Sequence, residues 1–418
     1  MTDGHVHSQH ESKLLSIPVE IRQAIYTQIF HGQTHAFLWH GRIHLSECLQ
    51  PNLGDDSHDG RERKSTVEWG GDDPKWARRL RSSWGVHWEC EEAANPEKTD
   101  MRKHRRQHAY DLLVVCKKMF IDVCDFVKTT VIIFTDVDTL NMWLLEPNEL
   151  NSGSNWAWDF QEYIRPSLRK LNVAFRLPLA FFEALEKALE EDEDFVLAGG
   201  DNTSFKSVQC NTWERLWPAV CQLPQLRSLH IWLDHDDRPS WSFVNERLAL
   251  HPVIAALAAR TQACSEEKIM QHLDIAVNLP KLHPRYAKPD THFFQEGPPP
   301  PFTIERRIRQ RWHCEERDSE KLYVGYKADF PVWHELPEMC KESTRMVREA
   351  DMTLQEEDVM LEEEDMTLEE VEELETRLWN EGTNVHEFMS DFNGPPPDED
   401  TIYSRRFLDQ SYLAPWFL

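Results

Sequence analysis

Apolar side chains near the start of the chain follow a pattern typical of an amphipathic helix. Ile21, Ile25 and Ile29 are spaced four residues apart, and two aromatic residues widen the same stripe. Pro18 fits the first turn of such a helix, because the N–H groups of that turn have no partner within the helix. Since a helix of this length is not stable alone in water, we predict that it docks on another part of the chain or on a partner.

A second amphipathic helix is predicted over residues 109–127. The charged residues Lys117, Lys118 and Asp122 lie outside its apolar stripe. The apolar positions that form the stripe are Leu112, Val115, Cys116, Met119, Val123 and Phe126. The buried strand 131–134 is expected to follow this helix directly.

Strands and helices then alternate. Strands are predicted at 168–175, 226–233 and 273–279, with helices around 179–189 and 241–260 between them. Alternation of this kind is typical of a parallel sheet with right-handed helical connections, so the predicted fold class is α/β. Two of the strands share the pattern Leu-Arg-x-Leu, which also fits an irregular leucine-rich repeat. The pattern therefore fits two interpretations equally well: ordinary buried parallel strands or an irregular leucine-rich repeat.

The last third of the chain is marked by a polyproline stretch and an acidic segment. Strand candidates at 302–312 and 321–327 are predicted to form a hairpin. Residues 351–380 hold thirteen acidic residues and the single base Arg377. Two copies of Asp-Met-Thr-Leu in this segment each have a threonine followed three residues later by a glutamate, the spacing of a helix capping box. We predict acidic amphipathic helices that either dock on a basic surface or partner, or remain in solvent.

Composition narrows the class of partner. The formal net charge is −27, which argues against a nucleic-acid partner and against an anionic membrane. Basic clusters at 75–81 and 102–106 could instead bind the acidic segment, serve in nuclear import or remain solvated. Arg306, Arg307, Arg309, Arg311 and Trp312 form a candidate RNA-binding surface, which the net charge opposes. The nine cysteines include no Cys-x-x-Cys pair, and the first residues contain no apolar signal core. These features predict reduced thiols and a location in the cytoplasm or nucleus, with no membrane partner.

Two blocks of sequence together resemble a known family. The first is Leu-Leu-x-Ile-Pro-x-Glu-Ile-Arg-x-x-Ile-Tyr at 14–26, and the second is Leu-Leu-Val-Val-Cys-Lys-Lys-Met-Phe at 112–120, followed by the strand 131–134. In this order they resemble a large family of fungal proteins of undefined biochemistry that begin with an F-box-like segment. The match covers about residues 13–45 and 109–235.

The resemblance implies a protein-interaction role. F-box segments proper recruit a Skp-type adaptor and bring substrates to a cullin ubiquitin ligase. Carried over to this sequence, the residues facing the adaptor would be Leu14, Leu15, Ile17, Pro18, Ile21 and Ile25. A full F-box has two further helices directly after the first, whereas here residues 46–100 interrupt them. The same apolar side chains could therefore serve only to close the core.

A phosphohydrolase is the alternative function. The strand 131–134 is followed by Asp136 and Asp138, an arrangement that resembles the nucleophile loop of haloacid-dehalogenase-type phosphatases. There the first aspartate attacks phosphorus, the second acts as general acid and Mg²⁺ lies between carboxylates. Acidic residues at 234–237, after another strand, could complete the metal site. Thr139 stands where glycine is usual in that loop, and an aspartate that caps the next helix is an equally simple explanation.

A zinc site is a further candidate. His87, Cys90, His104 and His108 have spacing similar to a zinc site, although the usual template begins with Cys-x-x-Cys. Histidine is abundant in this chain, so such spacing also arises by chance. The sequence otherwise predicts no cofactor.

The combined prediction is a non-enzymatic protein-interaction protein, with a Skp-type adaptor as the candidate partner. Its F-box-like helical start would pack on an irregular parallel strand–helix core of leucine-rich character, followed by an acidic helical segment. The expected division is 1–12 disordered, 13–45 F-box-like, 46–108 a partly disordered insertion, 109–340 the α/β core, 341–393 the acidic helical segment and 394–418 a tail.

Overall fold

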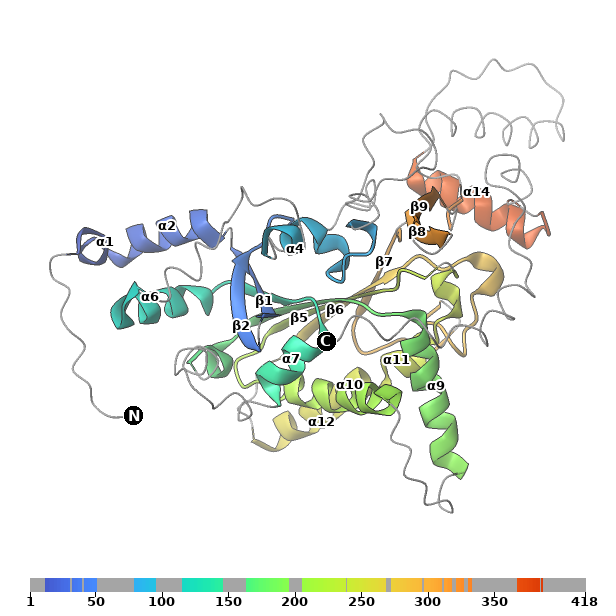
Figure 1. The fold of residues 1–418 in the computed structure, drawn as a ribbon. Helices are drawn as coiled ribbons and strands as arrows, with labels where there is room; N and C mark the ends of the chain where they lie inside the picture. The colour runs from blue at the N-terminus through green and yellow to red at the C-terminus, as the bar shows by residue number, and fades with distance from the viewer. Residues whose placement is uncertain are drawn as a thin grey trace.

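The structure is a computed structural model of the whole chain. It describes residues 12–50, 79–94, 115–145, 163–194, 205–332 and 367–385, except for 31, 40, 238, 268–271, 295–296, 310–311, 318–320, 327–329 and 384 within those ranges. Within these residues a seven-stranded sheet forms the centre of the molecule, and helices cover it (Figure 1). The fold class is α/β, as predicted.

The strands of the sheet follow one another in space almost as they do along the chain. The order is β2-β1-β3-β4-β5-β6-β7, and every neighbouring pair is parallel except the hairpin β1–β2. The bounds are β1 Gln33–Trp39, β2 Arg42–Glu47, β3 Val131–Phe134, β4 Lys170–Arg176, β5 Ser228–Asp234, β6 Asp274–Pro280 and β7 Thr303–Arg307. Because the order never reverses, right-handed crossovers must all run over the same face of the sheet.

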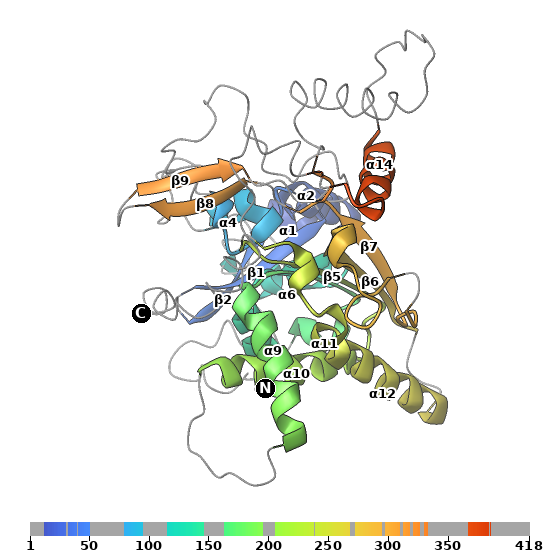
Figure 2. The same cartoon turned by 90° about the vertical axis from the view of Figure 1, so that its right-hand side faces the viewer.

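The connecting helices lie on that face (Figures 1 and 2). They are α7 Val137–Leu144, α9 Leu179–Asp194, α10 Phe205–Cys221, α11 Glu246–Ala249 and α12 His251–Glu267. On the opposite face lies a shorter segment, the 3₁₀ turn η1 Gly85–His87 and the helix α4 Trp88–Ala94. The helices α1 Lys13–Ser16, α2 Val19–Phe30 and α6 Lys117–Val127 lie together beside the β1–β2 hairpin.

Alternation along the strands divides the core in two. In β3, Ile132 and Phe134 face the large core beneath the crossover helices, whereas Ile133 faces the smaller cluster under α4. β1 behaves in the same way, with Ala36 in the large core and Phe37 in the small cluster. Adjacent residues of one strand therefore belong to different layers of the protein.

The predicted strands of the core are confirmed within two residues at either end, and the strand 131–134 is confirmed as predicted. The predicted helix 241–260 is three shorter elements: the 3₁₀ turn η3 Trp241–Phe243, α11 and α12. Asn245 interrupts it, because its side chain accepts the Leu248 N–H and starts a new helix there. The helix α10 was not predicted.

The prediction of a hairpin between 302–312 and 321–327 is wrong about the first of its two strands. β7 joins the main sheet parallel to β6, and a separate strand, β8 Trp312–Arg317, pairs with β9 Lys321–Tyr326. Without β7, β6 would be the edge strand of the sheet, with unpaired backbone N–H and C=O groups. β7 forms hydrogen bonds with these groups. The second predicted capping box is confirmed at the start of α14, Leu368–Asn380, where Thr367 and Glu370 cap each other. The first copy, at 351–357, lies outside the described residues.

The N-terminal segment, residues 13–47, shares the central sheet with the rest of the fold. β1 is hydrogen-bonded in parallel to β3 from Gln33 to Ala36, and Tyr26 and Phe30 of α2 belong to the large core. No helix among the described residues is long and apolar enough to cross a membrane.

Candidate functional sites

The helix α2 is held against α6 by a network of polar contacts. Arg22 donates from Nε and Nη2 to the two carboxylate oxygens of Asp122, at 2.7 Å each. The Tyr26 hydroxyl donates to the same carboxylate at 2.6 Å, and Arg22 also donates to the Ile17 carbonyl oxygen at 2.6 Å. These bonds fix the position of the helix and the short turn before it. Asp122 was predicted to lie outside the stripe, and it does, but it faces α2 and not open solvent.

This network changes the ionisation of its members. Burial acts to raise the pKa of Asp122, but hydrogen bonds from Arg22 and Tyr26 outweigh it and hold the pKa below its usual range. Burial and the hydrogen bond to the Asp122 carboxylate raise the pKa of the Tyr26 phenol. Asp122 therefore remains a carboxylate at neutral pH, and Tyr26 remains its donor.

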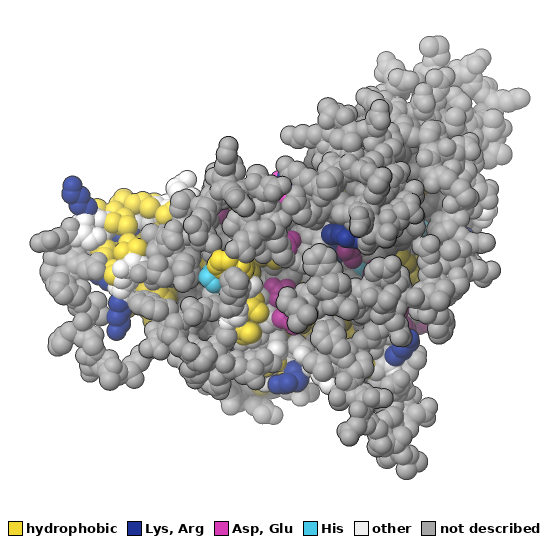
Figure 3. All heavy atoms as spheres, viewed as in Figure 1, with side chains coloured by type: hydrophobic (Ala, Val, Ile, Leu, Met, Phe, Trp, Pro, Cys, Tyr) yellow, Lys and Arg dark blue, Asp and Glu magenta, His cyan; other side chains and the backbone are white. Residues whose placement is uncertain are grey.

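One face of α2 is exposed and apolar. Ile21 has 52% of its surface exposed and Ile25 has 36%. Pro18, Ile21 and Ile25 are separated by three and four residues, so they lie on one side of the helix. We call Pro18, Ile21 and Ile25 the α2 outer patch. Val19 is also exposed, at 43%, but it is two residues from Ile21 and so projects from another side of the helix. Apolar side chains gather over α1 and α2 at the left end of the molecule in Figure 3.

The other residues assigned to partner binding lie deeper. Leu15 is 5% exposed and part of the large core, and Leu14 packs against that core. Ile17 is partly buried. The six residues predicted to face the adaptor therefore fall into two groups. Leu15 is part of the core, whereas Pro18, Ile21 and Ile25 are accessible to a partner. The single stripe predicted from the four-residue spacing also divides between the core side and the solvent side of the helix.

The aspartates of the phosphohydrolase alternative are engaged in structural contacts. Asp136 is the N-cap of α7, where its carboxylate accepts the Thr139 N–H at 2.6 Å and the Thr139 hydroxyl at 2.7 Å. Burial raises its pKa. Asp138 is exposed in the first turn of the same helix. Thr139, at the position where the phosphatase loop usually has glycine, is fully buried. Its hydroxyl oxygen accepts a hydrogen bond from the Leu38 N–H and so links α7 to β1.

The acidic residues after β5 are held separately. Asp234 pairs with Arg176 at 2.8 Å, and its pKa is lowered because Arg176 and Arg309 outweigh the effect of burial. Asp237 accepts the Leu179 N–H at 2.5 Å at the start of α9. Among the described residues these carboxylates do not form a group of three or more metal ligands with Asp136. The arrangement that a Mg²⁺ site would need is not assembled in this structure.

A compact group of histidines and cysteines lies on the other face of the sheet. His35 of β1, Cys48 after β2, His87 of η1 and Cys90 of α4 are all buried, and one ligand atom from each lies within 4.8 Å of every other. The Cys48 sulfur is 3.7 Å from His87 Nδ1, the Cys90 sulfur is 3.9 Å from the same nitrogen, and the two sulfurs are 4.0 Å apart. We call these four residues the His–Cys cluster.

The secondary structure explains why these four side chains meet. In the hairpin, Cys48 lies opposite Gln33, two positions along from the pair His35–Ser46, so His35 and Cys48 are diagonal neighbours on one face. The turn η1 and the first turn of α4 place His87 and Cys90 three residues apart on the side facing the sheet.

The sequence prediction found half of this cluster. His87 and Cys90 were assigned to a zinc site with His104 and His108, which lie outside the described residues. The structure brings His87 and Cys90 together with His35 and Cys48 instead, about 40 to 50 residues upstream. The alternation of His35 with Phe37 along a buried strand was the available signal, but only the hairpin register places Cys48 beside it.

Two arginines of the basic cluster 306–311 make internal contacts. Arg306 pairs with the buried Glu246, and it donates to the Phe293 carbonyl oxygen. Arg309 donates to the carbonyl oxygens of Pro239 and Asp237. These two guanidinium groups serve the fold and offer little to a nucleic acid.

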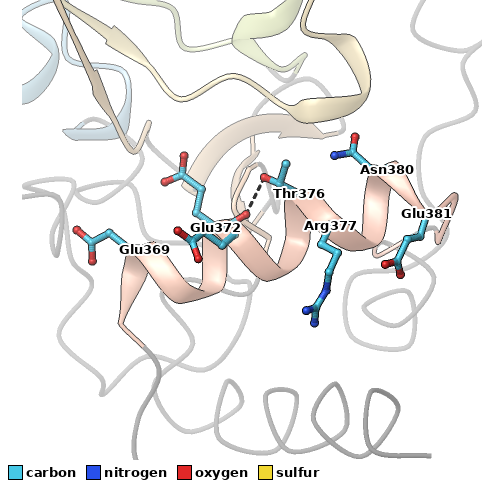
Figure 4. Close-up of a pocket in the computed structure, with 7 residues that line it drawn as sticks. Glu369, Glu372, Thr376, Arg377, Asn380 and Glu381 are labelled. Carbon is cyan, nitrogen blue, oxygen red and sulfur yellow. Dashed lines mark hydrogen bonds between the residues drawn. The ribbon is translucent and has the colours of Figure 1, made fainter. Parts of the chain in front are cut away.

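The acidic helix α14 is docked on the fold. Glu375 is fully buried, and its Oε1 accepts the Val332 N–H at 2.7 Å. Lys281 pairs with Glu372, and Trp379 packs its ring edge-on against His283, with 4.7 Å between centroids. An open hollow of about 680 Å³ lies beside this helix (Figure 4). Its described lining comes from one helix and is mostly acidic, and Thr376 donates to the Glu372 carbonyl within it. The described residues of the lining bring together no groups from different elements.

Comparison of the chain with protein-family models, curated proteins and solved structures finds no match. The function is therefore argued from the geometry of this chain alone.

Proposed function

We propose that the protein is a non-enzymatic interaction protein and that the α2 outer patch binds a Skp-type adaptor. The exposed apolar face of α2 is the observation that carries this proposal. Among the described residues, five large apolar side chains are exposed, and Ile21 and Ile25 of this patch are two of them. Clustered exposed apolar side chains are typical of protein-binding surfaces.

The helix beneath the patch is rigidly held. Its inner face packs Tyr26 and Phe30 against Phe126, with ring centroids 5.6 and 5.7 Å apart, and the Arg22–Asp122 pair fixes its first turns. A preorganised surface loses little conformational entropy when it binds. The resemblance of residues 14–26 to an F-box start supplies the nature of the partner. The leucine-rich character of the core is part of the same hypothesis and remains a prediction.

The test is a binding measurement with the full chain and a purified Skp-type adaptor. Ile21→Asp combined with Ile25→Asp places two charges in the patch while Tyr26 and Phe30 remain in the core. We expect loss of at least tenfold in affinity, because each charge would be desolvated at the interface. Phe294→Asp is the matched control, since Phe294 is 47% exposed and lies outside the patch.

Circular dichroism and the unfolding midpoint should be the same for the double variant and the control, because all three positions are exposed. Absence of adaptor binding by the wild-type protein would reject the adaptor as partner. Equal binding by wild type and double variant would show that the adaptor uses another surface.

A further inference from the structure

The His–Cys cluster has the ligand set of a structural metal centre. Two sulfurs and two imidazoles are the ligands that Zn²⁺ binds in closed, tetrahedral structural sites. Zinc–sulfur bonds of about 2.3 Å and zinc–nitrogen bonds of about 2.0 Å imply sulfur–sulfur separations of about 3.8 Å and sulfur–nitrogen separations of about 3.5 Å in a tetrahedron. The separations in the cluster are 4.0 Å between sulfurs and 3.7 and 3.9 Å from the sulfurs to His87 Nδ1.

Burial makes the cluster costly to leave without a ligand. His35 is fully buried, and neither ring nitrogen has a hydrogen-bond partner among the residues that the structure describes. An imidazole buried without partners loses its hydration with nothing in return. Its ring stacks on Trp84, with 5.0 Å between centroids, and lies 4.6 Å from the His87 ring. A metal ion would satisfy one nitrogen of His35.

The backbone beside the cluster supplies a hydrogen-bond donor to one of its sulfurs. The Leu49 N–H donates to the Cys90 sulfur at 3.2 Å, a contact that stabilises a thiolate.

We propose that His35, Cys48, His87 and Cys90 bind one structural Zn²⁺ ion. On binding, both cysteines are thiolates and both histidines are neutral, so any remaining thiol proton is released to solvent. Two thiolates balance the charge of Zn²⁺, which leaves a neutral centre suited to its apolar surroundings, Phe37, Trp84 and Ile133. The metal would join the β1–β2 hairpin, which provides Cys48, to the η1–α4 segment, which provides Cys90. These two cysteines are 42 residues apart in sequence.

The first measurement is the metal content of the full chain, purified without a polyhistidine tag and dialysed against a weak chelator. We expect one zinc ion per chain. Replacement by Co²⁺ is expected to give the thiolate-to-metal charge-transfer band and the strong visible bands of tetrahedral cobalt. This spectrum needs no variant, so it tests the site even where a substitution prevents folding.

Cys90→Ser and His35→Ala are expected to lose the zinc and the cobalt bands. Cys221→Ser is the matched control, because Cys221 is an equally buried free thiol outside the cluster, and it should keep both. Wild-type protein that is folded and takes up neither ion to one per chain would overturn the proposal. A thiol count showing Cys48 joined to Cys90 in a disulfide would overturn it as well. None of these outcomes depends on adaptor binding.

Discussion

At the scale of single residues, Asp122 has the largest identifiable effect on the position of α2. Its carboxylate accepts three hydrogen bonds, two from Arg22 and one from Tyr26. Both members of the ion pair are largely buried, with 13% and 15% of their side-chain surfaces exposed. A bidentate pair in this environment is stronger than an ordinary surface salt bridge.

Asp122→Asn should lower the free energy of unfolding by about 2 kcal/mol at pH 7, because a neutral amide cannot accept the same charge-assisted bonds. Urea unfolding monitored by tryptophan fluorescence measures this difference. Asp125→Asn is the control on the same helix, since Asp125 pairs with Lys128 while 55% exposed, and it should change stability by less than about 0.5 kcal/mol.

The same variant predicts a dependence on pH. The pKa of Asp122 is lower in the folded protein than in the unfolded chain, where it is about 3.9. Its contribution to stability is therefore complete above about pH 4 and is lost as pH falls through the lower folded value. The stability difference between wild type and Asp122→Asn should shrink in that acidic range. A difference that stays constant down to pH 2 would contradict the assigned ion pair.

The sequence shows which residues can take part in such contacts but not which of them meet. The apolar stripe predicted for 109–127 leaves Asp122 on the polar side of its helix, and the structure confirms this placement. That this side faces Arg22 depends on how two helices separated by about 100 residues pack. The same limitation applies to the His–Cys cluster, where the local pair His87 and Cys90 is visible in the sequence and its partners are not.

At the scale of elements, the acidic helix α14 is bound to the fold by a buried glutamate. Glu375→Ala should detach this helix, because the Val332 N–H would lose its acceptor inside the contact. We expect amide exchange over 368–380 to accelerate roughly tenfold, the equivalent of about 1.4 kcal/mol. Hydrogen exchange with mass spectrometry measures this rate peptide by peptide.

Glu373→Ala provides the comparison, since Glu373 is exposed on the same helix. It should leave the exchange rate within about twofold. Equal acceleration by both variants would mean that the total acidity of the helix, rather than the Glu375 contact, holds it in place.

The start of α14 could be predicted because a capping box is a local pattern: Thr367 and Glu370 lie three residues apart and satisfy each other's backbone groups. The docking site of α14 could not be predicted, because its contact residues Lys281 and Val332 lie far away in the sequence. The predicted hairpin at 302–327 failed for a related reason. β7 and β8 have similar alternation, and the open edge of β6, which decides between the partners, is a property of the whole sheet.

At the scale of the whole molecule, the sheet joins segments that the sequence separates. Parallel strands with intervening helices could be predicted from hydrophobic periodicity, and the order β3-β4-β5-β6 follows from the preference of consecutive strands to be neighbours. The addition of β1 to the free edge of β3 could not be predicted, because residues 46–108 intervene. This pairing makes the N-terminal segment part of the core sheet.

The pairing predicts that the N-terminal segment and the crossover core unfold together. Ala36 is 2% exposed, pairs with Phe134 of β3 and belongs to the large core. Ala36→Asp buries a charge without a partner, which should cost more than about 3 kcal/mol. If the sheet is one cooperative unit, this loss lowers protection from amide exchange in β5, β6 and α12 as well as in α2.

Val19→Asp is the matched control, because it introduces the same charge in the same segment at a position that is 43% exposed. It should leave exchange unchanged throughout. If Ala36→Asp increased exchange only over residues 13–47, the N-terminal segment would be an independent module. The β1–β3 pairing would then add little stability to the core. Cooperative loss would instead mean that the α2 outer patch is rigidly connected, through β1, β3 and the shared core, to the crossover helices.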